Sequence, residues 1–105
     1  MHRTAKMILF KRPSEEAKQA ITRILQKYYF SASEYNGETV FKRSNCGPGV
    51  PVSQYLKLTY TPVGIHLEAW LGKDGDAEEF PLTDHSVGSA GIVLNIIVEE
   101  IMSAA

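Results

Sequence analysis

Two segments with helical periodicity bracket a central region in which apolar and polar residues alternate. In both segments apolar residues recur at steps of three and four, which is typical of an amphipathic helix that covers a sheet with one side. The first stripe consists of Ala17, Ala20, Ile21, Ile24, Leu25 and Tyr28, and the second of Ala90, Val93, Leu94, Ile97, Val98 and Ile101. We expect the first helix to begin at Pro13–Glu16 with Ser14 as its cap, and the second to span residues 89–102.

The segments between and before these helices have the patterns of short strands. Asn36-Gly37 supplies the positive φ angles of a tight turn, so residues 29–35 and 38–43 are predicted to form a β-hairpin. Residues 55–61 and 65–71 alternate in polarity and predict a second hairpin with one buried face. A first strand over 3–12 and a short edge strand over 79–83 complete the set, and the glycines and prolines of residues 44–54 predict a loop.

This order of elements predicts one α+β domain over residues 1–105. We expect a two-layer sandwich, in which a curved antiparallel sheet of five or six strands carries both helices on one face, because an apolar sheet face needs a cover. The order β-α-β-β-β-β-(β)-α resembles the TATA-box-binding-protein-like and helix-grip layouts, which host many functions. The residues expected to share one core are Ile21, Ile24, Leu25, Leu56, Leu58, Leu67, Val93, Leu94 and Ile97.

The run Gly64-Ile65-His66-Leu67-Glu68-Ala69-Trp70 is the most distinctive in the chain. Together with the preceding helix and hairpin, it resembles small bacterial α+β domains of unknown function that occur alone or beside zinc-ribbon segments. The resemblance implies no particular catalytic or binding residues. The chain departs from the ribbon-bearing members, because its single cysteine, Cys46, cannot supply the ligand set of a structural zinc site.

Charge and hydrophobicity argue against two classes of partner. The net charge is −1, whereas proteins that depend on phosphate contacts normally have a clear basic excess. The early apolar run Met7–Phe10 is too short for a signal peptide, and the later apolar stretches are interrupted by polar residues before they could span a bilayer. We therefore expect a cytoplasmic protein that binds neither nucleic acid nor membrane, with no metal and no cofactor.

Four segments contain reactive residue types in arrangements that do not favour catalysis. Cys46 has no base near it in the sequence, and the consecutive residues 84–86, Asp-His-Ser, point in different directions and cannot form a relay. Residues 88–91, Gly-Ser-Ala-Gly, could admit an anion at a helix start but lack a phosphate-binding lysine. The acidic segment 74–79 lacks the residue order of an EF-hand loop. The structural readings are simpler. They are that Cys46 is an unreactive thiol, that residues 84–86 form a turn, that residues 88–91 begin a closely packed helix, and that residues 74–79 form a solvated turn.

The face of the second hairpin that points away from the predicted core combines aromatic and polar side chains. Aromatic residues with a polar group are enriched where proteins bind partners, so this face could bind a protein or a ligand. Alternatively, the 44–54 loop or another subunit covers it. The residues of this candidate binding face are Tyr55, Lys57, Thr59, His66, Glu68 and Trp70.

The last helix has a second apolar pair outside its core stripe. Ile92 and Ile96 lie four residues apart and share a helix face, which Glu99 continues. We expect this face to mediate a symmetric homodimer, unless a loop of the same chain covers it. The leading hypothesis is thus a non-enzymatic module that binds a protein partner or itself. A small-ligand binder with a pocket between helices and sheet is the alternative, and an enzyme is the third reading.

Overall fold

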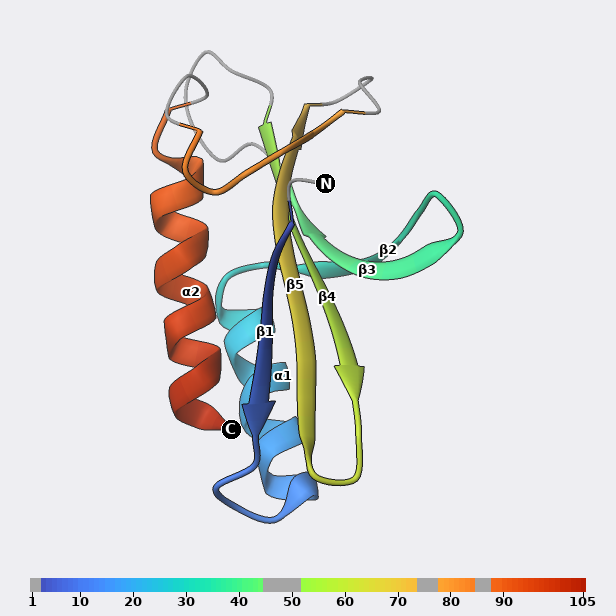
Figure 1. Ribbon diagram of the computed structural model, residues 1–105, viewed down its shortest axis with the longest axis vertical. Coiled ribbons are helices and arrows are strands. Elements are labelled where there is room, and N and C mark those ends of the chain that lie inside the picture. The colour runs from blue at the N-terminus through green and yellow to red at the C-terminus, as the bar shows by residue number, and fades with distance from the viewer. Residues whose placement is uncertain (1–2, 45–51, 74–77, 85–87) are drawn as a thin grey trace.

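The strands and helices expected from the sequence assemble into one curved sheet with two helices against one face (Figure 1). A computed structural model of the chain describes residues 3–44, 52–73, 78–84 and 88–105. In chain order the elements are β1 (Thr4–Leu9), α1 (Ser14–Lys27), β2 (Ser31–Tyr35), β3 (Glu38–Arg43), β4 (Val52–Tyr60), β5 (Gly64–Lys73), β6 (Glu79–Phe80) and α2 (Ala90–Ala104). The predicted α+β class, element order and antiparallel sheet are confirmed.

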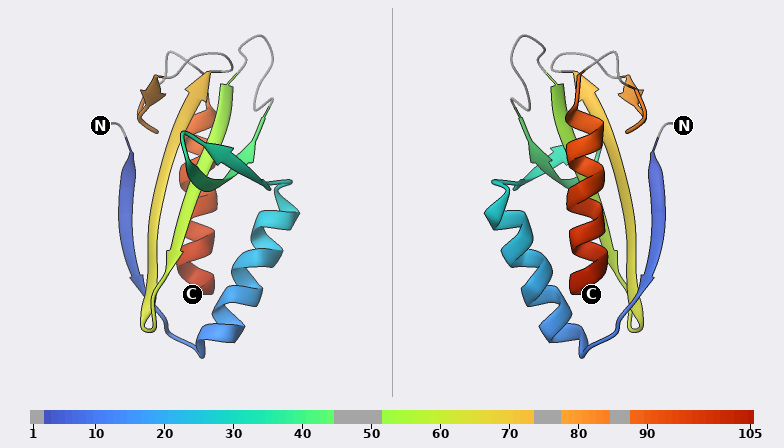
Figure 2. Two further views of the ribbon diagram at one scale, coloured as in Figure 1. Left: turned by 90° about the vertical axis from the view of Figure 1, so that its right-hand side faces the viewer. Right: turned by 90° about the vertical axis from the view of Figure 1, so that its left-hand side faces the viewer.

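The strands follow the order β1-β5-β4-β3-β2, and all pairs are antiparallel. β5 is shared on one side by two strands, since β1 pairs with its residues 64–69 and β6 with residues 71–72. β1 therefore forms one edge of the sheet and β2 the other. Both helices lie over the same sheet face, and in the right view of Figure 2 β1 lies to the side of α2 that faces away from α1.

The core fills the space between this face and the helices. All nine residues predicted to share it belong to it: seven are buried, and Leu58 and Val93 are half-buried against the others. Several of the largest side chains in it, among them Ile21, Leu67 and Leu94, are fully buried. The helical stripes therefore face the sheet because only that arrangement removes both stripes and the apolar sheet face from water together.

The boundaries of two elements differ from the sequence-based prediction. The predicted loop 44–54 is wrong at its end, because Val52–Gln54 already belong to β4. Val52 packs into the core, and the Gln54 side-chain amide donates a hydrogen bond to the Ala90 carbonyl oxygen at 2.8 Å. Ser14 does not cap α1, since the cap residue is Pro13 and no side chain bonds the first turn. A backbone bond from the Ala17 amide to the Pro13 carbonyl oxygen begins the helix instead.

The hairpin of β2 and β3 turns at Asn36 and Gly37, whose φ angles of 48° and 80° confirm the predicted tight turn. β3 pairs with β4 only through residues 41–43, so the rest of the hairpin is free to leave the plane of the sheet. It bends away from the helices and crosses in front of β4 in the left view of Figure 2. The sheet face opposite the helices is thus partly covered by its own hairpin.

Candidate functional site

The covered part of the outer sheet face contains a second, aromatic core. Val40, Tyr55 and Trp70 are buried there, with Tyr35 of the hairpin packed against them. The Tyr55 and Trp70 rings are stacked, with centroids 5.4 Å apart and planes inclined by 4°. The sequence placed both rings on the correct face, but the expectation that they face outward into solvent is wrong. The β2–β3 hairpin covers them through Tyr35 and Val40, and this removes two large aromatic surfaces from water. Most of the 44–54 segment, which the sequence offered as a cover, lies outside the described residues.

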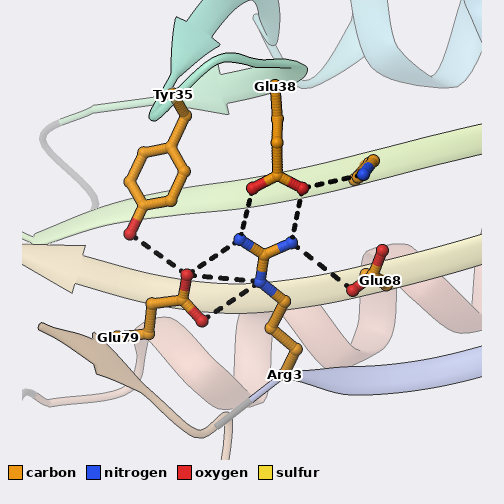
Figure 3. Close-up of polar contacts among 6 residues, drawn as sticks. Arg3, Tyr35, Glu38, Glu68 and Glu79 are labelled. Carbon is orange, nitrogen blue, oxygen red and sulfur yellow. Dashed lines mark hydrogen bonds and ion pairs between the residues drawn. The ribbon is translucent and has the colours of Figure 1, made fainter. Parts of the chain in front are cut away.

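Arg3, which directly precedes β1, lies against this aromatic core. Its guanidinium group is surrounded by Glu38, Glu68 and Glu79 (Figure 3). Its guanidinium carbon lies 3.7 Å from the centroid of the Trp70 ring, which is a cation–π contact. The same group donates hydrogen bonds to Glu38 at 2.7 and 3.0 Å and to Glu79 at 2.8 Å, and a longer one to Glu68 at 3.4 Å. One side chain therefore joins the segment before β1 to β3, β5 and β6.

We call Arg3, Tyr35, Glu38, Glu68 and Glu79 the Arg3 cluster. Within it, the Arg3 guanidinium forms ion pairs with the carboxylates. Hydrogen bonds from Arg3, supplemented by one from Lys57, lower the pKa of Glu38 to about 2. The bonds to Glu38 and Glu79 raise the pKa of Arg3. Burial, together with the nearby Glu79 carboxylate, raises the pKa of Tyr35, whose hydroxyl donates to Glu79 at 3.2 Å. Arg3 bonds all three carboxylates and Lys57 bonds Glu38 as well, so the polar groups of the cluster are engaged with one another and connect elements of the fold.

The structure divides the six residues of the predicted binding face. Tyr55 and Trp70 belong to the aromatic core, Glu68 bonds Arg3, and Lys57 bonds Glu38 at 2.7 Å. Thr59 and His66 lie opposite each other at the uncovered end of the β4–β5 pair, where Thr59 is exposed and His66 half-buried. Only this end of the predicted face is open.

The segments considered for chemistry fall mostly outside the described residues. Cys46, His85, Ser86 and residues 74–77 lie there. Gly91, at the start of α2, packs so closely that a Cβ atom would collide with the Leu82 carbonyl oxygen, which agrees with a closely packed helix start. Among the described ranges, no group of three or more potential ligand residues could hold a metal ion.

A second candidate surface is the outer edge of β1, which pairs with no strand among the described residues and which the sequence-based reasoning did not identify. The Phe10 amide donates to the Val63 carbonyl oxygen at 3.0 Å, just beyond the β1–β5 ladder. Since backbone groups alternate along an antiparallel strand, Lys6 and Ile8 also turn theirs toward β5, whereas Ala5, Met7 and Leu9 turn theirs away. The side chains of Met7 and Leu9 are 64% and 65% exposed. The uninterrupted apolar run Met7–Phe10 lies on this edge, but such a run is equally typical of a strand buried on both faces and does not by itself indicate an edge.

A groove runs between this edge and α2, and we call it the β1–α2 seam. It contains two hollows. The lower hollow, of about 540 Å³, lies between Met7–Leu9 and the last turns of α2 at Glu99, Met102 and Ser103. The upper one, of about 380 Å³, lies between Thr4 and the first turns of α2 at Gly91, Ile92 and Asn95. The seam therefore follows β1 along its length.

The residues predicted to mediate self-association lie on or beside this seam. Ile92 and Ile96 are 51% and 58% exposed, and Glu99 is exposed as well. Ile92 lines the upper hollow and Glu99 the lower one, whereas Ile96 lies outside both linings. The structure thus places a sheet edge next to the helix face that the sequence singled out.

Comparison with protein-family models, with curated proteins and with solved structures finds no match to this chain. Within the described residues, no helix is long and apolar enough to cross a membrane. The case for a function therefore rests on the geometry of the two surfaces described above.

Proposed function

We propose that the protein is a non-enzymatic interaction module that binds an extended polypeptide segment as an added strand along β1. The observation that carries this proposal is the outer edge of β1, flanked by exposed Met7 and Leu9 and by the β1–α2 seam. An added strand would satisfy the outward amides and carbonyls of Ala5, Met7 and Leu9. Recognition of this kind combines main-chain hydrogen bonds with side-chain contacts in an adjacent groove.

The outer edge of β1 is unusual for a strand edge that no described strand covers. Natural edge strands are usually short, charged, bulged or covered, because unpaired backbone groups invite association. β1 has six residues and one charged side chain, Lys6. Burying Met7 and Leu9 under a partner would contribute about 1.5–3 kcal/mol each at full burial. Backbone and side chains of β1 thus both favour an extended partner.

The alternatives have weaker support from the described residues. A small-ligand pocket between helices and sheet would occupy space that fully buried side chains such as Ile21, Leu56 and Leu94 already fill. An enzyme would need a titratable group free to react. The largest pKa shifts belong to Arg3 and Glu38, and these two groups are paired with each other in the Arg3 cluster. The seam, in contrast, is open and elongated along a strand edge, as a bound peptide requires.

The test is selection of peptides from a random display library against the dilute protein. Selected peptides should slow amide hydrogen exchange at Ala5, Met7 and Leu9, because these amides would become bonded. They should fail to bind Met7→Pro, which removes one outward donor but leaves the β1–β5 ladder bonds of Lys6 and Ile8. Ile96→Glu is the matched surface control and should bind them normally. Peptides that bind without protecting β1, or no binders at all, would refute the proposal.

A further inference from the structure

We infer that the strand accepted by β1 is β1 of a second copy, paired antiparallel about a two-fold axis at Met7. This inference rests on the proposed strand-adding function and names its occupant. It draws on three observations: which backbone groups point outward, which of them are already bonded, and where the charges of the seam lie.

The outward backbone groups select the register. In a two-fold pair of β1 strands, residues with outward groups must lie opposite one another, so the axis can pass Lys6, Met7 or Ile8. An axis at Lys6 would place two lysine side chains directly opposite, which is destabilising. An axis at Ile8 would pair Ala5 with Lys11 of the second copy, but the Lys11 amide already donates to the Ala105 carbonyl oxygen at 2.9 Å.

An axis at Met7 meets neither obstacle. It places Met7 opposite Met7 of the second copy and pairs Ala5 with Leu9 in both directions, so all three outward residues of each strand are bonded. On the outer sheet face, each exposed Leu9 then lies beside a small Ala5, and the two Met7 side chains contact each other. The exposed apolar side chains of β1 are thereby covered by their own counterparts.

The charges on the other side of the seam are complementary in the same register. Lys6 pairs with Leu67 of the core, so it lies on the helix side of the sheet, and it is exposed. With the axis at Met7, Lys6 lies opposite Ile8 of the second copy. That Ile8 borders the lower hollow, which also contains the exposed Glu99. Each Lys6 can therefore approach the other copy's Glu99, and symmetry makes this ion pair twice.

Sedimentation velocity over a hundredfold concentration range around tens of micromolar tests the inference. The wild type should form dimers, and Met7→Pro should remain monomeric with its far-ultraviolet spectrum unchanged. Lys6→Glu and Glu99→Lys should each raise the dimer Kd about tenfold, because each reverses a charge at both symmetric pairs. The double variant Lys6→Glu/Glu99→Lys should restore the wild-type Kd, which a general loss of stability would not do.

Three outcomes would overturn the inference. A wild type that stays monomeric while library peptides still protect β1 would leave the proposed function standing with a different occupant. A monomer that also selects no peptide would remove both. A dimer that survives Met7→Pro and dissociates in Ile92→Glu/Ile96→Glu would place the interface on the outer face of α2.

Discussion

The Arg3 guanidinium carbon lies 3.7 Å from the centroid of the Trp70 ring, although the two residues are far apart in the sequence. Trp70 is fully buried, and the Arg3 side chain is 10% exposed. Arg3 thus combines a cation–π contact with hydrogen bonds to three carboxylates. The cluster holds the β2–β3 hairpin against the sheet, because Glu38 and Tyr35 belong to the hairpin and Trp70 to β5.

We predict that Arg3→Ala lowers the free energy of unfolding by about 2–4 kcal/mol, because it leaves the partly buried Glu68 and Glu79 carboxylates without their cation and Glu38 with Lys57 alone. Urea unfolding followed by Trp70 fluorescence measures this change. Lys18→Ala is the control, since the Lys18–Glu15 pair is exposed and 3.7 Å long, and it should change stability little. Equal effects of the two substitutions would show that the Arg3 cluster does not stabilise the hairpin.

Stability should also fall in acid because of Glu38. Its pKa in the folded protein is lowered from 4.5 to about 2 by Arg3 and Lys57. The ionised carboxylate therefore stabilises the fold above pH 4.5, and this contribution is lost as the pH falls toward 2. Urea midpoints measured across this interval should decline less steeply in Glu38→Gln than in the wild type. Parallel declines would contradict the assigned pKa.

The core assignment predicts that Leu67→Ala and Leu94→Ala each lower the free energy of unfolding by about 2–5 kcal/mol, because each leaves a cavity where a fully buried side chain was. Val63→Ala, at a side chain that is 65% exposed, is the matched control and should be nearly neutral. Thermal or urea unfolding distinguishes these outcomes. Changes under about 0.5 kcal/mol at both leucines would mean that the helical stripes do not face the sheet.

The close approach of α2 to the segment after β6 predicts the effect of a single methyl group. Alanine normally stabilises a helix relative to glycine by about 1 kcal/mol. Gly91→Ala should nevertheless destabilise the protein, because the new Cβ meets the Leu82 backbone and cannot be accommodated by a side-chain rotation. Unfolding by urea gives the sign. A stabilised variant would show that α2 does not pack against Leu82 as closely as described.

The parts of the fold that local patterns determine were predictable from the sequence. The helical stripes, the Asn36-Gly37 turn and the alternation in β4 and β5 each depend on residues that are neighbours along the chain. The burial of Trp70 was not predictable in this way. It depends on how far a hairpin bends over the sheet and on Arg3, which precedes the first strand.

The candidate site shows the same division between local and long-range information. Ile92 and Ile96 could be recognised as an exposed pair because helical spacing separates them from the core stripe. The outer edge of β1 could not, because it depends on which strand pairs with β5 and on where β6 joins the sheet. The sequence of the six-residue β1 also does not indicate an edge strand, since a continuous apolar run is equally typical of a strand buried on both faces.

A matched pair of substitutions separates the β1 edge from the α2 face. Met7 and Ile96 are exposed to similar extents, 64% and 58%, and neither belongs to the core. Met7→Ser should weaken the dimer, because it removes the two side chains that meet at the proposed axis and leaves a polar pair there. Ile96→Ser should leave the dimer Kd unchanged, since Ile96 lies outside both hollows of the seam. Each loss of apolar contact in Met7→Ser is expected to cost about 1 kcal/mol, so Kd should rise more than tenfold with both copies substituted. Light scattering across a dilution series measures both constants, and the reverse ranking of the two variants would assign self-association to α2.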